Sequence, residues 1–125
     1  VSGNTIDAIN FYRDWFGKKN ERCIVAGDFN NSIIWDKKGN DNNFNNINDH
    51  FVDLGFVSNY HSLKKETFGK ESSATFYHTK KESKKYHIDY IYSKNLIPKE
   101  LQVGLYSDWI QYSDHSPLVV EYNIL

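Results

Sequence analysis

The sequence of 125 residues contains no methionine and only one cysteine. Because Cys23 has no second cysteine to pair with, no disulfide can form within the chain, and disulfide usage gives no support for secretion. A complete, unprocessed translation product begins with methionine, so its absence predicts that residues are missing upstream. No stretch approaches the roughly 20 apolar residues needed to cross a bilayer. We therefore expect a soluble protein without a membrane span, and we favour the cytoplasm over other compartments.

Neither sign of charge dominates, since the sequence has 15 Lys and Arg residues and 16 Asp and Glu residues, and the formal net charge is -1. A dedicated nucleic-acid binder usually has a strongly basic balance or a basic face, so the charge neither proves nor excludes such a partner. Hydrophobic residues make up 39% of the chain and aromatic residues 16%. At this length the composition favours one core, and we expect a single unit over residues 1–125.

Apolar residues at helical spacing predict two helices. The first covers about Thr5–Phe16, with a cap at Asn4 or Thr5 and an end at Gly17. The second covers Phe44–Leu54. Residues 30–46 are rich in Asn, Asp and Gly, which predicts a long loop.

Short apolar or alternating runs predict strands, which outnumber the helices and cluster late in the chain. The run Cys23–Ala26 is expected to be buried on both faces and to end at Gly27-Asp28. The further candidates are Phe56–Tyr60, Ala74–Thr79, Tyr86–Tyr92, Leu101–Tyr106 and Pro117–Ile124. Residues 80–85 are expected to form the turn of a hairpin between the second and third of these strands. We expect an α/β fold of the α+β kind, with one mixed, mainly antiparallel sheet and helices on one face.

Three short motifs place a carboxylate at the end of, or within, an apolar strand, where an unpaired charge would be costly. They are Gly27-Asp28-Phe29-Asn30, His87-Ile88-Asp89-Tyr90-Ile91 and Ser113-Asp114-His115-Ser116-Pro117-Leu118. Taken singly, each is also compatible with a turn, a capped backbone amide or a loop pair. In this order, with the third leading into the last strand, the combination is much more specific.

If the sheet brings Asp28, Asp89 and Asp114 to one edge, their mutual repulsion requires compensation. Two remedies are a hard divalent cation, which takes oxygen ligands, and a protonated His115 held against one aspartate. A cation, an imidazolium and the amide of Asn30 together suit the binding of a phosphate during attack by water. The motifs therefore predict phosphoester hydrolysis.

The three motifs resemble the closing motifs of the endonuclease/exonuclease/phosphatase superfamily, which includes DNase I-like nucleases, abasic-site nucleases similar to exonuclease III, inositol polyphosphate phosphatases and neutral sphingomyelinases. The resemblance runs from the first predicted helix to the last predicted strand. It implies a four-layer α/β/β/α sandwich and the use of Mg²⁺ or Mn²⁺. It also implies that Asp28 orients or deprotonates the attacking water and that Asn30 helps to hold the water or the phosphate.

In the same way, the resemblance implies that Asp89 positions and charges His115. His115 would then contact the scissile phosphate and stabilise its developing charge, and Asp114 would lie in the ligand sphere of the metal. For substrate binding we consider His87, Trp109 and Tyr112. His87 is two residues from Asp89 and would share its face in a strand, although a structural role is the stronger alternative. The two aromatic residues precede Asp114 and would line a groove for bases, although aromatic residues in such positions more often pack in the core.

The family's amino-terminal half supplies an asparagine and a glutamate as metal ligands, and no counterpart is present in this sequence. The resemblance therefore implies that the chain is the carboxy-terminal half of the domain, inactive or nearly so by itself. A sheet face that the whole domain buries would be exposed, which predicts self-association of the fragment. By analogy with the family, we expect nucleic acid to be the leading substrate of the parent protein. The alternatives are a phosphatase or phosphodiesterase acting on an inositol phosphate or lipid headgroup, and a non-catalytic binding module that retains the fold.

Overall fold

The computed structural model describes residues 4–124 and has an α+β fold with small antiparallel sheets and few helices. The strands are β1 (Cys23–Asp28), β2 (Val57–Ser58), β3 (Phe76–Tyr77), β4 (Lys85–Tyr86), β5 (Asp89–Lys94), β6 (Ile97–Val103) and β7 (Leu118–Asn123). The helices are α1 (Thr5–Phe11), α2 (Arg13–Phe16), α3 (Phe44–Asp53), α4 (Asn59–Lys64) and α5 (Tyr106–Trp109), with short 3-10 helices at Ile33–Trp35 and His78–Lys80.

The strands form three separate sheets, in the orders β1-β5-β2, β3-β4 and β6-β7. Every pairing between these strands is antiparallel. The expectation of one mixed sheet was therefore wrong. The predicted hairpin is confirmed in a short form, because β3 and β4 each contribute two paired residues, Phe76 opposite Tyr86 and Tyr77 opposite Lys85.

The predicted first helix is present but divided. Asn4 caps α1, because its side chain accepts a hydrogen bond from the Asp7 backbone N–H at 2.9 Å while the Asp7 carboxylate accepts one from the Asn4 N–H at 3.2 Å. This capping box satisfies two N–H groups at the start of the helix. Tyr12 interrupts the helix at φ -99° and ψ 11°, and α2 ends at Gly17 as predicted.

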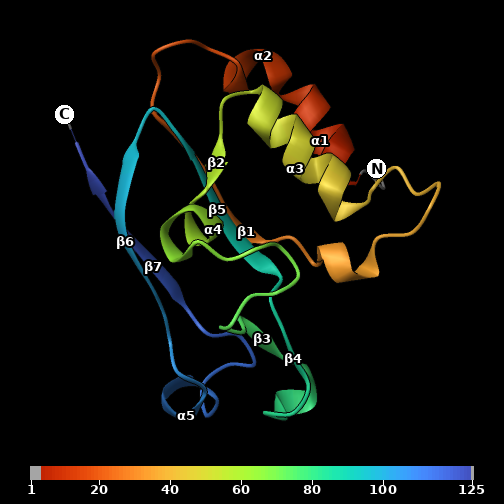
Figure 1. Ribbon diagram of the computed structural model, residues 1–125, viewed down its shortest axis with the longest axis vertical. Helices are drawn as coiled ribbons and strands as arrows, with labels where there is room; N and C mark the ends of the chain where they lie inside the picture. Colours follow the sequence, from red (N-terminus) through yellow and green to blue (C-terminus); the bar gives the residue numbers. More distant parts are fainter. Residues whose placement is uncertain (1–3, 125) are drawn as a thin grey trace.

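The main core lies between the helices and one face of the β1-β5-β2 sheet, where α1 and α3 run beside the sheet (Figure 1). The ring of Phe51 stacks on Tyr92 with centroids 4.3 Å apart, and Phe44 stacks on Tyr90 at 4.5 Å. The buried members of this core are Ile6, Ile9, Phe44, Ile47, Phe51, Leu54, Phe56, Tyr90 and Tyr92. Alternate residues of β5 therefore carry the aromatic layer on which the helices pack.

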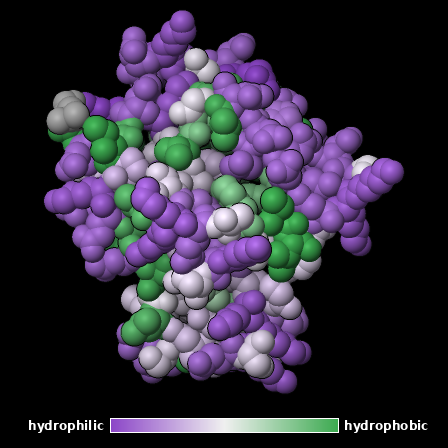
Figure 2. Space-filling model, viewed as in Figure 1, coloured by the Kyte–Doolittle hydropathy of each residue, from purple (hydrophilic) through white to green (hydrophobic). Residues whose placement is uncertain are grey.

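The opposite face of β1 is not buried as predicted. Side chains of β1 alternate between half-buried and exposed at its start, and Ile24 is 49% exposed. Within the described residues β1 pairs with β5 alone and forms the edge of its sheet. On the side of the molecule shown in Figure 2, hydrophobic residues form separate patches among hydrophilic ones.

One predicted strand is largely replaced by a helix, and another is present with shifted bounds. In the segment predicted as a strand over Phe56–Tyr60, only β2 is extended, and α4 begins at Asn59. The Asn59 side chain donates to Ser93 Oγ at 2.8 Å and accepts from the Tyr122 hydroxyl, so contacts distant in sequence hold it in the interior. The strand expected at Leu101–Tyr106 begins earlier, as β6, and gives way to α5.

Replacing Phe51 with Ala tests the core. The side chain is 1% exposed and contacts the rings of Tyr92, Phe56 and Phe29, so its removal leaves a cavity. We expect the free energy of unfolding to fall by about 3–5 kcal/mol in a denaturant titration. The exposed neighbour Val52 provides the control, because Val52→Ala should change it by less than about 0.5 kcal/mol.

The loop after α4 is closed by Glu66, whose carboxylate accepts hydrogen bonds from the Tyr60 hydroxyl at 2.5 Å, the Ser72 N–H at 2.8 Å and the Ser72 hydroxyl at 2.6 Å. The hydrogen bonds from Ser72 and Tyr60 lower the pKa of Glu66 from 4.5 to about 2. A carboxyl group whose pKa is depressed in the folded state stabilises the protein at pH values above its unfolded-state pKa. This stabilisation is lost as the pH falls through the folded-state pKa and the group is protonated.

We therefore expect the free energy of unfolding to decline as the pH falls from about 4.5 to about 2. Glu66→Gln should reduce this decline, because glutamine does not titrate. Denaturant titrations of both proteins at several pH values measure the difference. Identical pH dependences of the free energy of unfolding in the unaltered protein and in Glu66→Gln would contradict the lowered pKa of Glu66.

Candidate functional site

The antiparallel pairing of β1 with β5 places two of the predicted carboxylates directly opposite each other. Asp28, the last residue of β1, is the partner of Asp89, the first residue of β5. The strand reaches Asp28 through Gly27 at φ +146°, a conformation that residues with a Cβ rarely adopt. Glycine is therefore required immediately before this carboxylate.

His115 lies between the two aspartates. Its Nδ1 is 2.9 Å from Asp89 Oδ2, and its Nε2 is 3.7 Å from Asp28 Oδ2. Since an ionised carboxylate only accepts, the Nδ1–H of the ring donates to Asp89. Asp28 and His115 remain accessible, with side chains 36% and 31% exposed, whereas Asp89 is 16% exposed. Predicted residues from all three motifs thus meet at one place.

Thr75 positions both Asp89 and the segment that carries His115. Its hydroxyl oxygen accepts from the backbone N–H groups of Ile88 at 3.0 Å and Asp89 at 3.2 Å. Its carbonyl oxygen accepts from the Ser116 N–H at 2.9 Å. The side chain is completely buried. Sequence reasoning missed Thr75, because a single threonine within a predicted strand has no pattern that marks it.

Asn30 and Asp28 form a tight local turn. The Asn30 N–H donates to Asp28 Oδ1 at 2.8 Å, and Asn30 adopts a left-handed conformation with φ 49°. Such turns are typical of Asp and tolerate Asn in the left-handed region. Asn30 is exposed beside the site, and its backbone fixes one oxygen of the carboxylate.

Asp114 contributes through its backbone. Its carbonyl oxygen accepts from the Tyr77 N–H at 2.8 Å, and the adjacent His115 forms an isolated bridge with Phe76. Among the described residues, two groups have ligand atoms close enough to hold a metal ion, and Asp114 belongs to neither. The structure therefore brings together Asp28, Asp89 and His115 without the Asp114 carboxylate.

A cavity of about 450 Å³ opens beside Asp89 and His115, and Asp28 is not part of its lining. Its lining includes Asp89, His115 and Trp109. A Cβ at Gly104 would lie 2.6 Å from a Trp109 ring atom, so glycine there leaves room for the indole. Tyr112 is 74% exposed and does not line this cavity.

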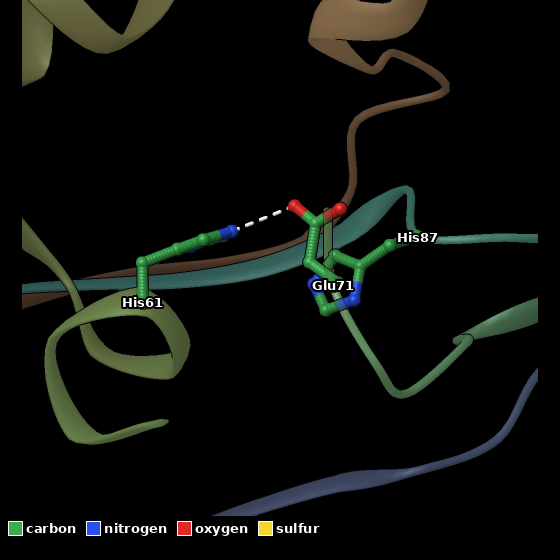
Figure 3. Close-up of side chains that lie close together, drawn as sticks. All are labelled: His61, Glu71 and His87. Atoms are coloured by element: carbon green, nitrogen blue, oxygen red, sulfur yellow. Dashed lines mark hydrogen bonds and ion pairs between the residues drawn. The ribbon is translucent and has the colours of Figure 1, made fainter. Parts of the chain in front are cut away.

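His87 does not join the Asp28–Asp89–His115 group. It precedes the start of β5 and is buried with His61 and Glu71 (Figure 3), so the expectation that it shares the face of Asp89 fails. Burial lowers the pKa of His87 and so favours the neutral ring. Burial also opposes ionisation of Glu71, but the hydrogen bond to His61 and those to backbone N–H groups outweigh it, and the pKa of Glu71 is lowered.

Comparisons with known protein families and with curated protein sequences give no match. No helix within residues 4–124 is long and apolar enough to cross a membrane.

Thr75→Val tests how the site is held together. Valine has nearly the same shape as threonine but removes the oxygen that accepts from Ile88 and Asp89, leaving two N–H groups without that partner. We expect a loss of about 1–3 kcal/mol in the free energy of unfolding, measured by denaturant titration. The exposed Thr67→Val is the control and should be nearly neutral. Equal stabilities of the two variants would show that the hydroxyl of Thr75 is not needed.

Proposed function

We propose that the chain is part of a divalent-metal-dependent phosphoesterase, with nucleic acid as the leading substrate. The observation that supports this best is the imidazole of His115 held between Asp89 and Asp28 at the edge of an open cavity. Buried ion pairs also occur for structural reasons, but here two of the three side chains are accessible. The arrangement suits a ligand that carries negative charge and a water molecule that attacks it.

Asp89 is the positioning residue in this proposal. It receives the Nδ1–H of His115 and so leaves Nε2 directed to the side where Asp28 lies. A carboxylate at this nitrogen orients the ring and balances the charge of a protonated imidazole. From Nε2, such a ring donates a hydrogen bond to a phosphate oxygen and stabilises the negative charge that develops there.

Asp28 is the residue that would orient or deprotonate the attacking water. Its Oδ1 is engaged by the Asn30 N–H, whereas its Oδ2 lies 3.7 Å from His115 Nε2, beyond direct hydrogen-bonding distance. A water molecule, which can accept from the ring N–H and donate to the carboxylate, would bridge such a separation. We propose that Asn30 helps to hold this water or the phosphate.

Mg²⁺ or Mn²⁺ is the cofactor that this proposal requires. These ions prefer oxygen ligands and often bind through one or two carboxylates together with waters and substrate phosphates. Asp28 and Asp89 suit that partial role, since ligand atoms of the two carboxylates and His115 lie within 4.8 Å of one another. When bound, the ion would neutralise charge on the phosphate. Further ligands are expected from the amino-terminal half that the resemblance implies.

We propose in addition that the chain is the carboxy-terminal half of a four-layer sandwich. The exposed face of β1, including Ile24, is compatible with a second sheet packing there. For this reason activity should be assayed both in the chain alone and in the parent protein with that half restored. The chain alone should bind Mg²⁺ or Mn²⁺ weakly at this site and show little hydrolysis.

Substitutions of His115 and Asp28 test the proposed chemistry. In the parent protein, His115→Ala and Asp28→Asn should each lower Mg²⁺-dependent cleavage of plasmid DNA by about 10²–10⁴-fold, because each removes a group that acts on the reacting atoms. His50→Ala and Asp53→Asn are matched controls on α3, outside the Asp28–Asp89–His115 group, and should retain activity. Circular dichroism checks that all four variants are folded.

The same assay distinguishes the substrate classes. Cleavage of DNA supports the nuclease, whereas release of phosphate from an inositol phosphate alone would identify a phosphatase. A third outcome is that the parent protein hydrolyses neither substrate with Mg²⁺ or Mn²⁺ and binds a partner equally well with and without His115→Ala. That result would contradict the enzyme proposal and support a non-catalytic binding module.

A further inference from the structure

A second group of ionisable side chains is buried apart from the Asp28–Asp89–His115 site. His61 comes from α4, Glu71 from the loop that follows and His87 from the segment before β5 (Figure 3). The side chains of His61 and Glu71 are 7% and 6% exposed, and His87 is 5% exposed. Polar atoms buried to this degree normally have at least one hydrogen-bond partner in the protein or in an ordered water.

One nitrogen of this group has no partner. The Nδ1 of His87 lies 2.9 Å from the Ser73 carbonyl oxygen, which can only accept, so Nδ1 carries the hydrogen. The lone pair of the neutral ring is then on Nε2. This atom is buried and forms no hydrogen bond. A buried ring nitrogen in this tautomer is able to bind a metal ion.

The other two side chains are also held by outer partners. His61 Nδ1 lies 2.7 Å from the Ser58 hydroxyl, which leaves Nε2 facing Glu71. Both oxygens of the Glu71 carboxylate accept from the Gly69 N–H at 3.1 Å. Histidine and carboxylate ligands of metals are typically oriented by such contacts at their far side. All three side chains thus have the support that ligands require.

The carboxylate of Glu71 is buried, which disfavours its charge. Its ion-pair partner is His61, with Nε2 2.7 Å from Oε2, and that ring is charged only if it is protonated. A buried carboxylate is costly without a compensating charge. Either a proton on His61 or a metal ion among the three side chains would supply this charge, but only the metal ion would also engage Nε2 of His87.

We propose that His61, Glu71 and His87 form a binding site for a divalent transition-metal ion of the Zn²⁺ class, independent of the proposed phosphoesterase site. Two imidazoles with one carboxylate suit Zn²⁺ or Fe²⁺, whereas Mg²⁺ and Ca²⁺ prefer oxygen ligands alone. One ligand atom from each residue lies within 4.8 Å of the others. Bonds of about 2.0–2.2 Å in a tetrahedral site place the ligand atoms roughly 3.4 Å apart.

Binding needs side-chain movements of no more than about 1.4 Å, because ligand atoms that lie within 4.8 Å of one another would settle about 3.4 Å apart. The contact between His61 and Glu71 at 2.7 Å would open by less than about 1 Å to admit the ion. A cavity of about 300 Å³ is lined by Glu71 and His87 and provides space for a water as the fourth ligand. Phe68 stacks on the His61 ring, with centroids 3.6 Å apart, and restricts its movement.

The first test is direct binding of Zn²⁺ to the 125-residue chain, measured by competition with a chromophoric chelator. His61→Gln and His87→Gln should each lower the affinity at least tenfold, because each removes one ligand and leaves two. His50→Gln and His115→Gln should leave this affinity unchanged, since neither residue belongs to the group. The His115 variant also separates this site from the proposed catalytic one.

The second test uses the unaltered protein and does not depend on how the variants fold. X-ray absorption at the zinc edge, with one equivalent of Zn²⁺, should show two imidazole ligands, oxygen ligands and no sulfur. A single imidazole would place the ion at Asp28, Asp89 and His115 and overturn the proposal. It would also be overturned if Zn²⁺ did not bind, or if folded His61→Gln and His87→Gln variants kept the affinity of the unaltered chain. Loss of hydrolysis in the parent protein would not bear on it.

Discussion

The register between β1 and β5 is the constraint on which the candidate site depends. It places Asp28 opposite Asp89 at the end where both side chains face His115. Because side chains alternate along a strand, a slip of one residue would send every side chain of β1 to the opposite face. The same register places Tyr90 and Tyr92 against the helices. Formation of the core and assembly of the site are thus consequences of one strand pairing.

The segment around Thr75 separates two groups of histidine and carboxylate side chains. The Ser73 carbonyl oxygen holds His87, and the hydroxyl of Thr75 holds the backbone of Ile88 and Asp89. His87 and Asp89 are only two residues apart, yet they belong to different groups. They do not share a face because β5 begins at Asp89, so the alternation expected of a strand does not extend back to His87.

Local pattern predicted some elements well and others poorly, for identifiable reasons. The segment Phe44–Asp53 has a strong helical spacing of apolar residues, and α3 forms as expected. Residues 56–60 are apolar enough for a strand, but Asn59 is bonded to Ser93 and Tyr122, and these distant contacts favour the turn into α4. Short apolar runs do not by themselves distinguish a strand from a buried helical turn.

The sequence alone determined which residues were candidates: the motifs predicted Asp28, Asp89 and His115, and these three meet in space. They were recognisable because ionisable residues at the ends of apolar runs stand out from the pattern of core formation. Only the tertiary structure decided that the Asp114 carbonyl oxygen binds the Tyr77 N–H, that the Thr75 hydroxyl binds the backbone at Asp89 and that His61 and Glu71 join His87. These outcomes depend on contacts between distant segments, whose geometry follows from packing and strand register rather than from any local spacing.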